Sequence, residues 1–159
     1  MKKTNLAVFL LSIFLLGSAG LANAGIEKKS KIPGNIQAEI DELKKSQTQN
    51  PADPDIYFIL GTDYWRLDQY EEAIKNFQRA VRLQPDYFSA HWNLSLLYNL
   101  QGEGADAIIH MKKAERLFLK MKDVKALAQA RKKLRNYFVK YRYKPEDFEI
   151  STGFWEKLF

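Results

Sequence analysis

The chain has 159 residues, a formal net charge of +6 at pH 7 and no cysteine. Its length supports one domain with an adequate hydrophobic core. The absence of cysteine excludes disulfide bonds, thiolate metal sites and the lipid-bearing cysteine of a bacterial lipoprotein.

Residues 1–24 have the pattern of a secretory signal peptide. Lys2 and Lys3 form a basic start, residues 6–16 are an apolar run of eleven residues, and Ala22-Asn23-Ala24 is a small-x-small cleavage site. The run is well short of the ~20 apolar residues that a spanning helix needs, so we expect cleavage rather than an uncleaved membrane anchor. No Arg-Arg pair occurs in this segment, which favours general secretion. The expected location is the periplasm.

The segment after the cleavage site changes from polar to helical in character. Residues 25–35 are polar, rich in lysine and end near Pro33-Gly34, so we expect a flexible linker. Apolar residues then recur at helical spacing and predict a helix over 36–47. After a break, Asp53 can cap the next helix and Pro54 can take its first position. The apolar side of the helix predicted over 36–47 is formed by Ile36, Ile40 and Leu43.

Residues 54–87 and 88–121 repeat each other at an interval of thirty-four residues. A fixed period of this length is typical of stacked helical repeats. The matched positions include Tyr57 with His91, Leu60 with Leu94, Gly61 with Ser95, Tyr64 with Tyr98, Ala73 with Ala107, Phe77 with Met111 and Ala80 with Ala114. Helices are expected at 55–67, 70–83, 87–101, 104–118 and 123–141.

This pattern resembles the tetratricopeptide repeat (TPR) family. The second copy departs from the family's signature at Leu119, where a proline is expected. The resemblance implies an all-α, TPR-type helical solenoid with two full repeats, flanked by the helices at 36–47 and 123–141. It also implies a surface that binds other proteins rather than a reaction centre. In the first copy the signature places hold Tyr57, Leu60, Gly61, Tyr64, Ala73, Phe77, Ala80 and Pro85.

A second stripe of side chains lies beside the packing stripe of each repeat's first helix. The resemblance implies that this stripe lines a concave groove. Two indoles and a phenylalanine in such a groove predict an apolar site for a peptide or helix of a partner protein. The alternative is that the chain covers the groove with its own C-terminal tail. The predicted groove residues are Phe58, Thr62, Trp65, Arg66, Trp92, Asn93, Leu96 and Asn99.

Positive charge is concentrated between residues 124 and 145, where eight basic residues and no acidic residue occur. Two interpretations stay open. The segment contacts an anionic membrane surface or an acidic partner, or it is a solvated helix face whose lysine stems cover apolar surface. No nucleic acid partner is expected for a secreted chain. The predicted basic surface consists of Lys125, Arg131, Lys132, Lys133, Arg135, Lys140 and Arg142.

Residues 142–159 form an aromatic C-terminal tail. Its last apolar side chains fall on a single helical face, and such a tail seldom stays in water. We expect it to pack on the chain itself, and docking into a second copy, which would give a homo-oligomer, is the alternative. The side chains of this face are Phe154, Trp155, Leu158 and Phe159.

The sequence contains no Gly-rich phosphate loop, no His-Glu-x-x-His and no nucleophile elbow. His91 takes a packing place and His110 precedes Met111 of the core, so both are expected to be structural. We therefore expect a non-enzymatic adaptor or scaffold of the bacterial cell envelope, without cofactor or metal, that holds another envelope protein. The alternatives are a membrane-surface structural protein that uses the basic helix, and a self-assembling TPR oligomer.

Overall fold

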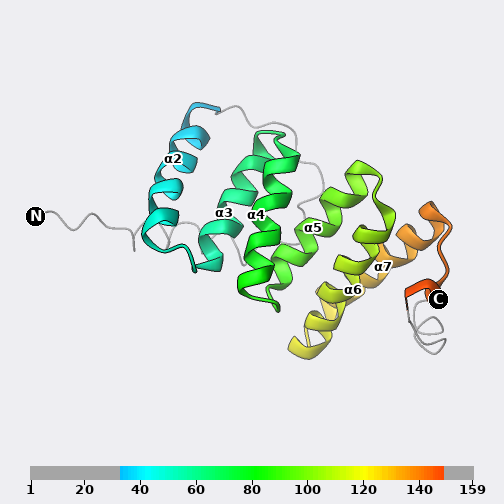
Figure 1. Ribbon diagram of the computed structural model, residues 1–159. Coiled ribbons are helices and arrows are strands. Elements are labelled where there is room, and N and C mark those ends of the chain that lie inside the picture. The colour runs from blue at the N-terminus through cyan, green and yellow to red at the C-terminus, as the bar shows by residue number, and fades with distance from the viewer. Residues whose placement is uncertain (1–32, 149–159) are drawn as a thin grey trace, which may run out of the picture. The chain divides into compact units, whose positions relative to one another are not determined.

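The computed structural model describes residues 33–148, and this part of the chain contains six α-helices and no strand (Figure 1). Helices α3 and α4 form the first repeat and α5 and α6 the second, with α2 and α7 on either side. Each helix packs on the next one in the chain, which confirms the predicted all-α solenoid of two full repeats with flanking helices. None of these helices is long and apolar enough to cross a membrane. The elements are α2 (Pro33–Gln49), α3 (Pro54–Arg66), α4 (Tyr70–Leu83), α5 (Phe88–Gln101), α6 (Gly104–Met121), α7 (Val124–Tyr141) and the 3-10 turn η1 (Pro145–Phe148).

Capping residues in the sequence set the starts of two helices. The Asp53 carboxylate accepts a hydrogen bond from the backbone N–H of Asp55 at 2.9 Å, and Pro54 opens α3. The Asp123 carboxylate accepts from the backbone N–H of Ala126 at 2.9 Å and so starts α7. Such caps satisfy N–H groups that have no partner within the helix. The predicted cap and first position of α3 are therefore confirmed.

The core follows the thirty-four-residue period. The larger of its two clusters runs from α3 to α7, and a smaller cluster joins α2 to α3 through Ile36, Ile40, Ile56 and Leu60. Side chains at matched positions of the two repeats are fully buried, and removing this apolar surface from water is the main stabilising contribution. The fully buried matched pairs are Ala73 with Ala107, Phe77 with Met111 and Ala80 with Ala114.

Two parts of the predicted organisation need correction. The linker predicted over 25–35 is too long, because α2 already begins at Pro33, and a proline is well accommodated in the first helical turn. The helix predicted to end at 118 continues to Met121, because Leu119 stands where a proline would have stopped it. Residues 25–32 of the predicted linker, and the signal segment before them, lie outside the described residues.

The start of the predicted C-terminal tail is part of the packed structure. Phe148 of η1 contacts the rings of Phe138 and Tyr143, with centroids 5.7 and 5.3 Å apart, and its carbonyl accepts a hydrogen bond from Lys112 of α6. The tail therefore returns to α6 and α7 at this point. Residues 149–159, with the predicted apolar face, lie outside the described residues.

Helices α3 and α4 approach each other closely at Gly61. A Cβ atom there would lie 2.8 Å from Cδ1 and Cε1 of the fully buried Phe77 ring. In the second repeat the same two positions hold Ser95 and the flexible Met111, and Ser95 donates a hydrogen bond to the Ala107 carbonyl at 2.7 Å. The contact of Gly61 with Phe77 in the first repeat thus corresponds to the positions of Ser95 and Met111 in the second repeat.

We expect Gly61→Ala to lower the free energy of unfolding by about 1–2 kcal/mol, because overpacking against Phe77 exceeds the gain in helix propensity. Combining it with Phe77→Met should give less destabilisation than the sum of the two single changes, by about 1 kcal/mol. Chemical denaturation followed by circular dichroism measures all four proteins of this cycle. Strict additivity would show that the close approach at Gly61 is not limiting.

Candidate functional site

The predicted groove residues of α3 form an aromatic platform. Phe58 and Trp65 are half-buried, and both rest on Phe77 of α4, with ring centroids 5.6 and 6.4 Å away. Phe58 also stacks on Tyr87, which precedes α5, at 5.0 Å. The hydroxyl of Tyr87 donates to the Asp55 carboxylate at 2.6 Å and so fixes the ring. The platform therefore has a rigid base and a partly exposed upper side.

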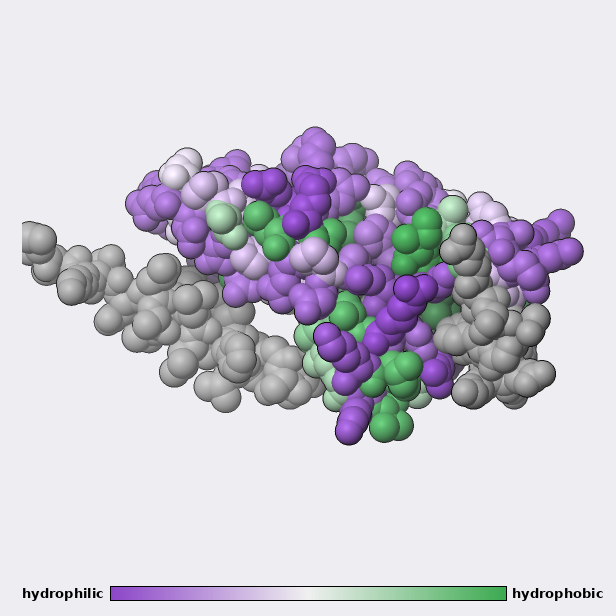
Figure 2. Space-filling model, turned by 60° about the horizontal axis from the view of Figure 1, so that its bottom comes forward, coloured by the Kyte–Doolittle hydropathy of each residue, from purple (hydrophilic) through white to green (hydrophobic). Residues whose placement is uncertain are grey.

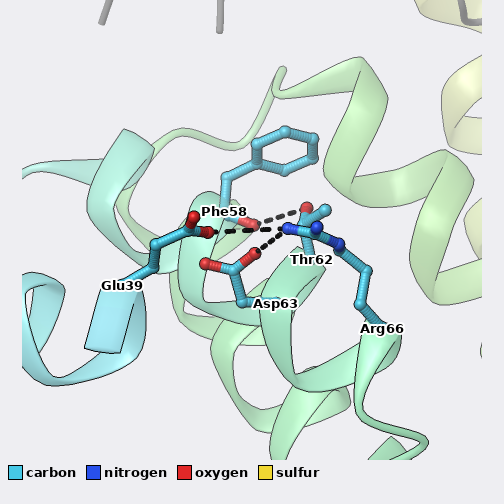
Figure 3. Close-up of polar contacts among 5 residues, drawn as sticks. All are labelled: Glu39, Phe58, Thr62, Asp63 and Arg66. Atoms are coloured by element: carbon cyan, nitrogen blue, oxygen red, sulfur yellow. Dashed lines mark hydrogen bonds and ion pairs between the residues drawn. The ribbon is translucent and has the colours of Figure 1, made fainter. Parts of the chain in front are cut away.

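The polar groove residues of α3 are held by contacts within the chain (Figure 3). Thr62 donates its hydroxyl proton to the Phe58 carbonyl at 2.9 Å. Arg66 lies between Asp63, at 3.0 Å, and Glu39 of α2, at 3.6 Å, so it ties α2 to α3. Burial raises the pKa of Asp63, and the hydrogen bond from Arg66 partly opposes this rise. Arg66 thus has a structural role, which the sequence did not reveal.

Trp92 is less accessible to a binding partner than the sequence indicated. It is only 7% exposed, because Phe118 of α6 meets its ring edge-on at 5.9 Å and the Lys133 ammonium of α7 lies 5.6 Å from a ring centroid. Trp92, predicted as a residue of the groove, is therefore a core side chain instead. Its register matches that of Phe58, but α7 covers this part of α5. Asn93 and Leu96 remain partly exposed on α5.

Asn99 joins α5 to the end of α7. Its side-chain oxygen accepts hydrogen bonds from the Lys140 ammonium at 2.9 Å and from the Tyr141 hydroxyl at 3.1 Å. A predicted groove residue and a predicted basic-surface residue are thus partners of each other. The partly exposed groove set that remains is Phe58, Thr62, Trp65, Asn93 and Leu96.

The basic residues of α7 do not form one solvated face. Arg131 donates to the buried Glu115 carboxylate at 2.9 Å. Lys133 is half-buried over Trp92, and burial lowers the pKa of its ammonium. Arg135 is half-buried as well, whereas Lys125, Lys132 and Arg142 are exposed. An open hollow on this helix is lined by Val124, Leu127, Ala128, Arg131, Lys132 and Arg135.

The two histidines form a pair between α5 and α6. Nδ1 of His91 lies 3.0 Å from Nδ1 of His110, and Nε2 of His91 lies 3.0 Å from the Pro85 carbonyl. A carbonyl oxygen only accepts, so His91 carries its proton on Nε2 and accepts through Nδ1 the proton of His110. In the first repeat Tyr57 donates to the Pro51 carbonyl at 2.9 Å, one period earlier. His91 therefore takes the structural place of Tyr57.

Burial lowers the pKa of both imidazoles, and that of His110 falls to about 4, with the neighbouring His91 contributing. Tyr98 stacks on His110 at 5.5 Å and closes the other side of the ring. Within residues 33–148 no group of three or more histidine, aspartate or glutamate side chains is placed to hold a metal ion.

Comparisons with known proteins agree with this geometry. A family model described as tetratricopeptide repeat matches residues 58–118. Over 61 residues the chain is 34% identical to tetratricopeptide repeat-containing protein trd-1 of Caenorhabditis elegans, a match that takes 38% of this chain and 8% of that protein. The chain thus spans only a small part of this curated relative.

Solved structures show the same helical arrangement. The type III secretion translocator chaperone SycD of Yersinia enterocolitica matches with a TM-score of 0.63 and 15% identity, over 69% of this chain and 77% of that chain. A crystal structure of MamA matches with a TM-score of 0.54 and 30% identity, over 68% of this chain and 65% of that chain. A further crystal structure of MamA matches with a TM-score of 0.53 and 27% identity, over 74% of this chain and 70% of that chain.

Proposed function

This chain belongs to the tetratricopeptide repeat family, and we propose that it is an adaptor that holds a peptide or helix of a partner protein on α3 and α5. Proteins built from this repeat are generally non-enzymatic adaptors that bind other proteins, and we extend that role to this chain. The contact surface would be the groove set of Phe58, Thr62, Trp65, Asn93 and Leu96.

The observation that carries this proposal is the aromatic platform on α3. Phe58 and Trp65 are both supported from below by Phe77 and stay partly exposed above. A rigid aromatic surface loses little conformational entropy on binding, which is why aromatic residues dominate interface hot spots. Thr62 already satisfies its hydroxyl donor within the helix. An apolar side chain of the partner therefore fits this surface better than a charged one.

Site-specific crosslinking would locate the partner. A benzoylphenylalanine at Thr62 should capture the partner from envelope extract, whereas the same group at Lys75, exposed on α4, should not. Mass spectrometry identifies the captured protein. Equal capture from both positions, or capture only of a second copy of the chain, would remove the support for a partner on this surface.

We expect Trp65→Ala and Leu96→Ala each to weaken binding of the captured partner roughly tenfold, because each removes a supported apolar contact. Leu100→Ala is the control, since Leu100 is an apolar side chain at the end of α5 that is 57% exposed and lies outside the groove set. Trp92 is unsuitable for this test because it belongs to the core. Isothermal titration calorimetry measures the affinities of the parent chain and of the three variants, and unchanged values for Trp65→Ala and Leu96→Ala would refute the proposed surface.

We keep the periplasm as the proposed location, and an envelope protein as the proposed partner. Both rest on the signal-peptide pattern of residues 1–24. A homo-oligomer through the C-terminal tail stays a prediction of the sequence.

A further inference from the structure

The turn between α6 and α7 alternates exposed apolar and cationic side chains. Residues 119–125 read Leu-Lys-Met-Lys-Asp-Val-Lys, and we call this segment the α6–α7 tip. Leu119 and Met121 are each 54% exposed and Val124 is 77% exposed. These are large values for apolar side chains that lie within six consecutive residues. The three lysines of the tip, Lys120, Lys122 and Lys125, are also exposed.

The tip is a fixed structure that projects from the repeats. Helix α6 has 18 residues and α4 has 14, and four more residues lengthen a helix by about 6 Å. The end of α6 accordingly reaches beyond that of α4 (Figure 1). Backbone N–H groups of Lys122 and Asp123 donate to the Leu119 and Phe118 carbonyls at 3.1 Å and close the turn. The buried Phe118 ring anchors the tip to Phe88 and Trp92.

The charge of the tip is net positive and directed outward. Its single carboxylate, Asp123, is used as the N-cap of α7. Figure 2 shows hydrophobic and hydrophilic atoms side by side at the lower margin, where the α6–α7 turn of Figure 1 comes forward. Further along α7, by contrast, Arg131, Lys133 and Lys140 are held by partners within the chain. In the tip, exposed lysines therefore alternate with exposed apolar side chains of the same short segment.

We propose that the α6–α7 tip docks on an anionic lipid surface. Leu119, Met121 and Val124 enter the headgroup region, while the lysine stems lie along it and their ammonium groups contact lipid phosphates. A protein partner fits these side chains less well, because hot spots are rich in Trp, Tyr and Arg, and the tip has none of them. This inference goes beyond the proposed adaptor function and is independent of it, since the groove set contributes no residue to the tip.

A probe placed on the tip tests the docking directly. Because the chain has no cysteine, Met121→Cys provides a unique site for a nitrobenzoxadiazole dye in the full-length protein. Vesicles of phosphatidylglycerol with phosphatidylethanolamine should shift the dye emission to the blue and raise its intensity. Vesicles of phosphatidylcholine alone should not, and added salt should reverse the effect. The same dye at Lys75→Cys, exposed on α4, is the control for position.

Charge variants supply the second arm of the test. Each lysine near an anionic surface contributes about fivefold to binding, so neutralising Lys120, Lys122 and Lys125 together to glutamine should weaken vesicle affinity roughly 100-fold. The matched control neutralises Lys45, Lys75 and Arg82, which are exposed elsewhere and give the same change in charge. Circular dichroism should show both triple variants folded.

Two results would overturn the proposal. One is a dye on Met121→Cys that does not respond to the anionic vesicles. The other is equal vesicle affinity of the two triple variants, which would assign any binding to segments outside the tip. The first result, together with capture of a protein by the tip, would identify a protein as the occupant instead of lipid. Groove binding of a partner is measured without vesicles, so the two proposals fail separately.

Discussion

Phe77→Ala is expected to lower the free energy of unfolding by about 3–5 kcal/mol. Phe77 is fully buried between α3 and α4, and its ring supports Phe58, Trp65 and the backbone at Gly61. Removing the ring leaves a cavity that two helices cannot close without losing their own packing. Small domains are stable by only 5–15 kcal/mol, so this loss is a large share of the total. Urea denaturation followed by circular dichroism measures it.

Val139→Ala is the control for this change, because Val139 is an apolar but exposed residue of α7. It should change the unfolding free energy by less than about 0.5 kcal/mol. Phe77→Leu separates the two roles of Phe77, since it keeps an apolar side chain in the core but removes the ring that supports Phe58 and Trp65. If Phe77→Ala were as mild as Val139→Ala, the platform could not be the rigid element on which the proposed partner site depends.

The fold was predictable because the thirty-four-residue period places the same kind of side chain at the same depth twice. Phe77 and Met111 differ in shape, yet both are fully buried, and so are Ala73 and Ala107. Helix starts were predictable where a capping carboxylate precedes a helix, as at Asp53. These features depend on local chemistry and on spacing, which the sequence displays directly.

The candidate site was less predictable because the exposure of its residues depends on the side chains of neighbouring helices. Trp92 has the register of Phe58, but Lys133 and Phe118 cover it, and nothing in the period specifies that cover. Arg66 and Asn99 are likewise engaged by side chains from other helices, at 3.6 Å from Glu39 and 2.9 Å from Lys140. Such contacts join residues that are far apart in sequence, and the sequence pattern alone gives no sign of them.

The histidine pair could have been found by comparing the two repeats. His91 stands where the first repeat has Tyr57, and His110 stands where it has Asn76, thirty-four residues earlier. Because both positions differ between the two repeats and lie on neighbouring helices, a different contact between them is expected in the second repeat. The structure shows that His91 keeps the hydrogen bond to the proline carbonyl and adds one to His110. The expectation that both histidines are structural agrees with this arrangement.

Stability is expected to fall by about 3 kcal/mol through His110 as the pH decreases from 7 to 4, because the folded chain resists protonation of this imidazole. Burial and His91 hold the pKa of His110 at about 4, against an ordinary 6.5. Between these two pH values the unfolded chain binds more protons than the folded chain, so the free energy of unfolding rises with pH. This contribution is fully present above pH 6.5 and is progressively lost below it.

The geometry of the His91–His110 pair further disfavours protonation of both rings. One proton can be accommodated if His91 donates through Nδ1 and His110 accepts, but two protonated rings would direct N–H groups at each other across 3.0 Å. The pair therefore titrates as a unit rather than as two independent sites. Lys113 also disfavours the charged form of His91 and lowers its pKa further. Tyr98, stacked on His110, offers no carboxylate that could stabilise an imidazolium.

His110→Asn removes this contribution, because it restores the residue found at the matched position of the first repeat and cannot ionise in this range. Its amide can donate to Nδ1 of His91, so the α5–α6 contact is kept. Urea denaturation at a series of pH values should show the advantage of the parent chain over the variant shrinking by about 3 kcal/mol from pH 7 to pH 4. Carboxylates titrate equally in both proteins and cancel in the difference. Parallel curves would mean that His110 is protonated as readily in the folded chain as in the unfolded one.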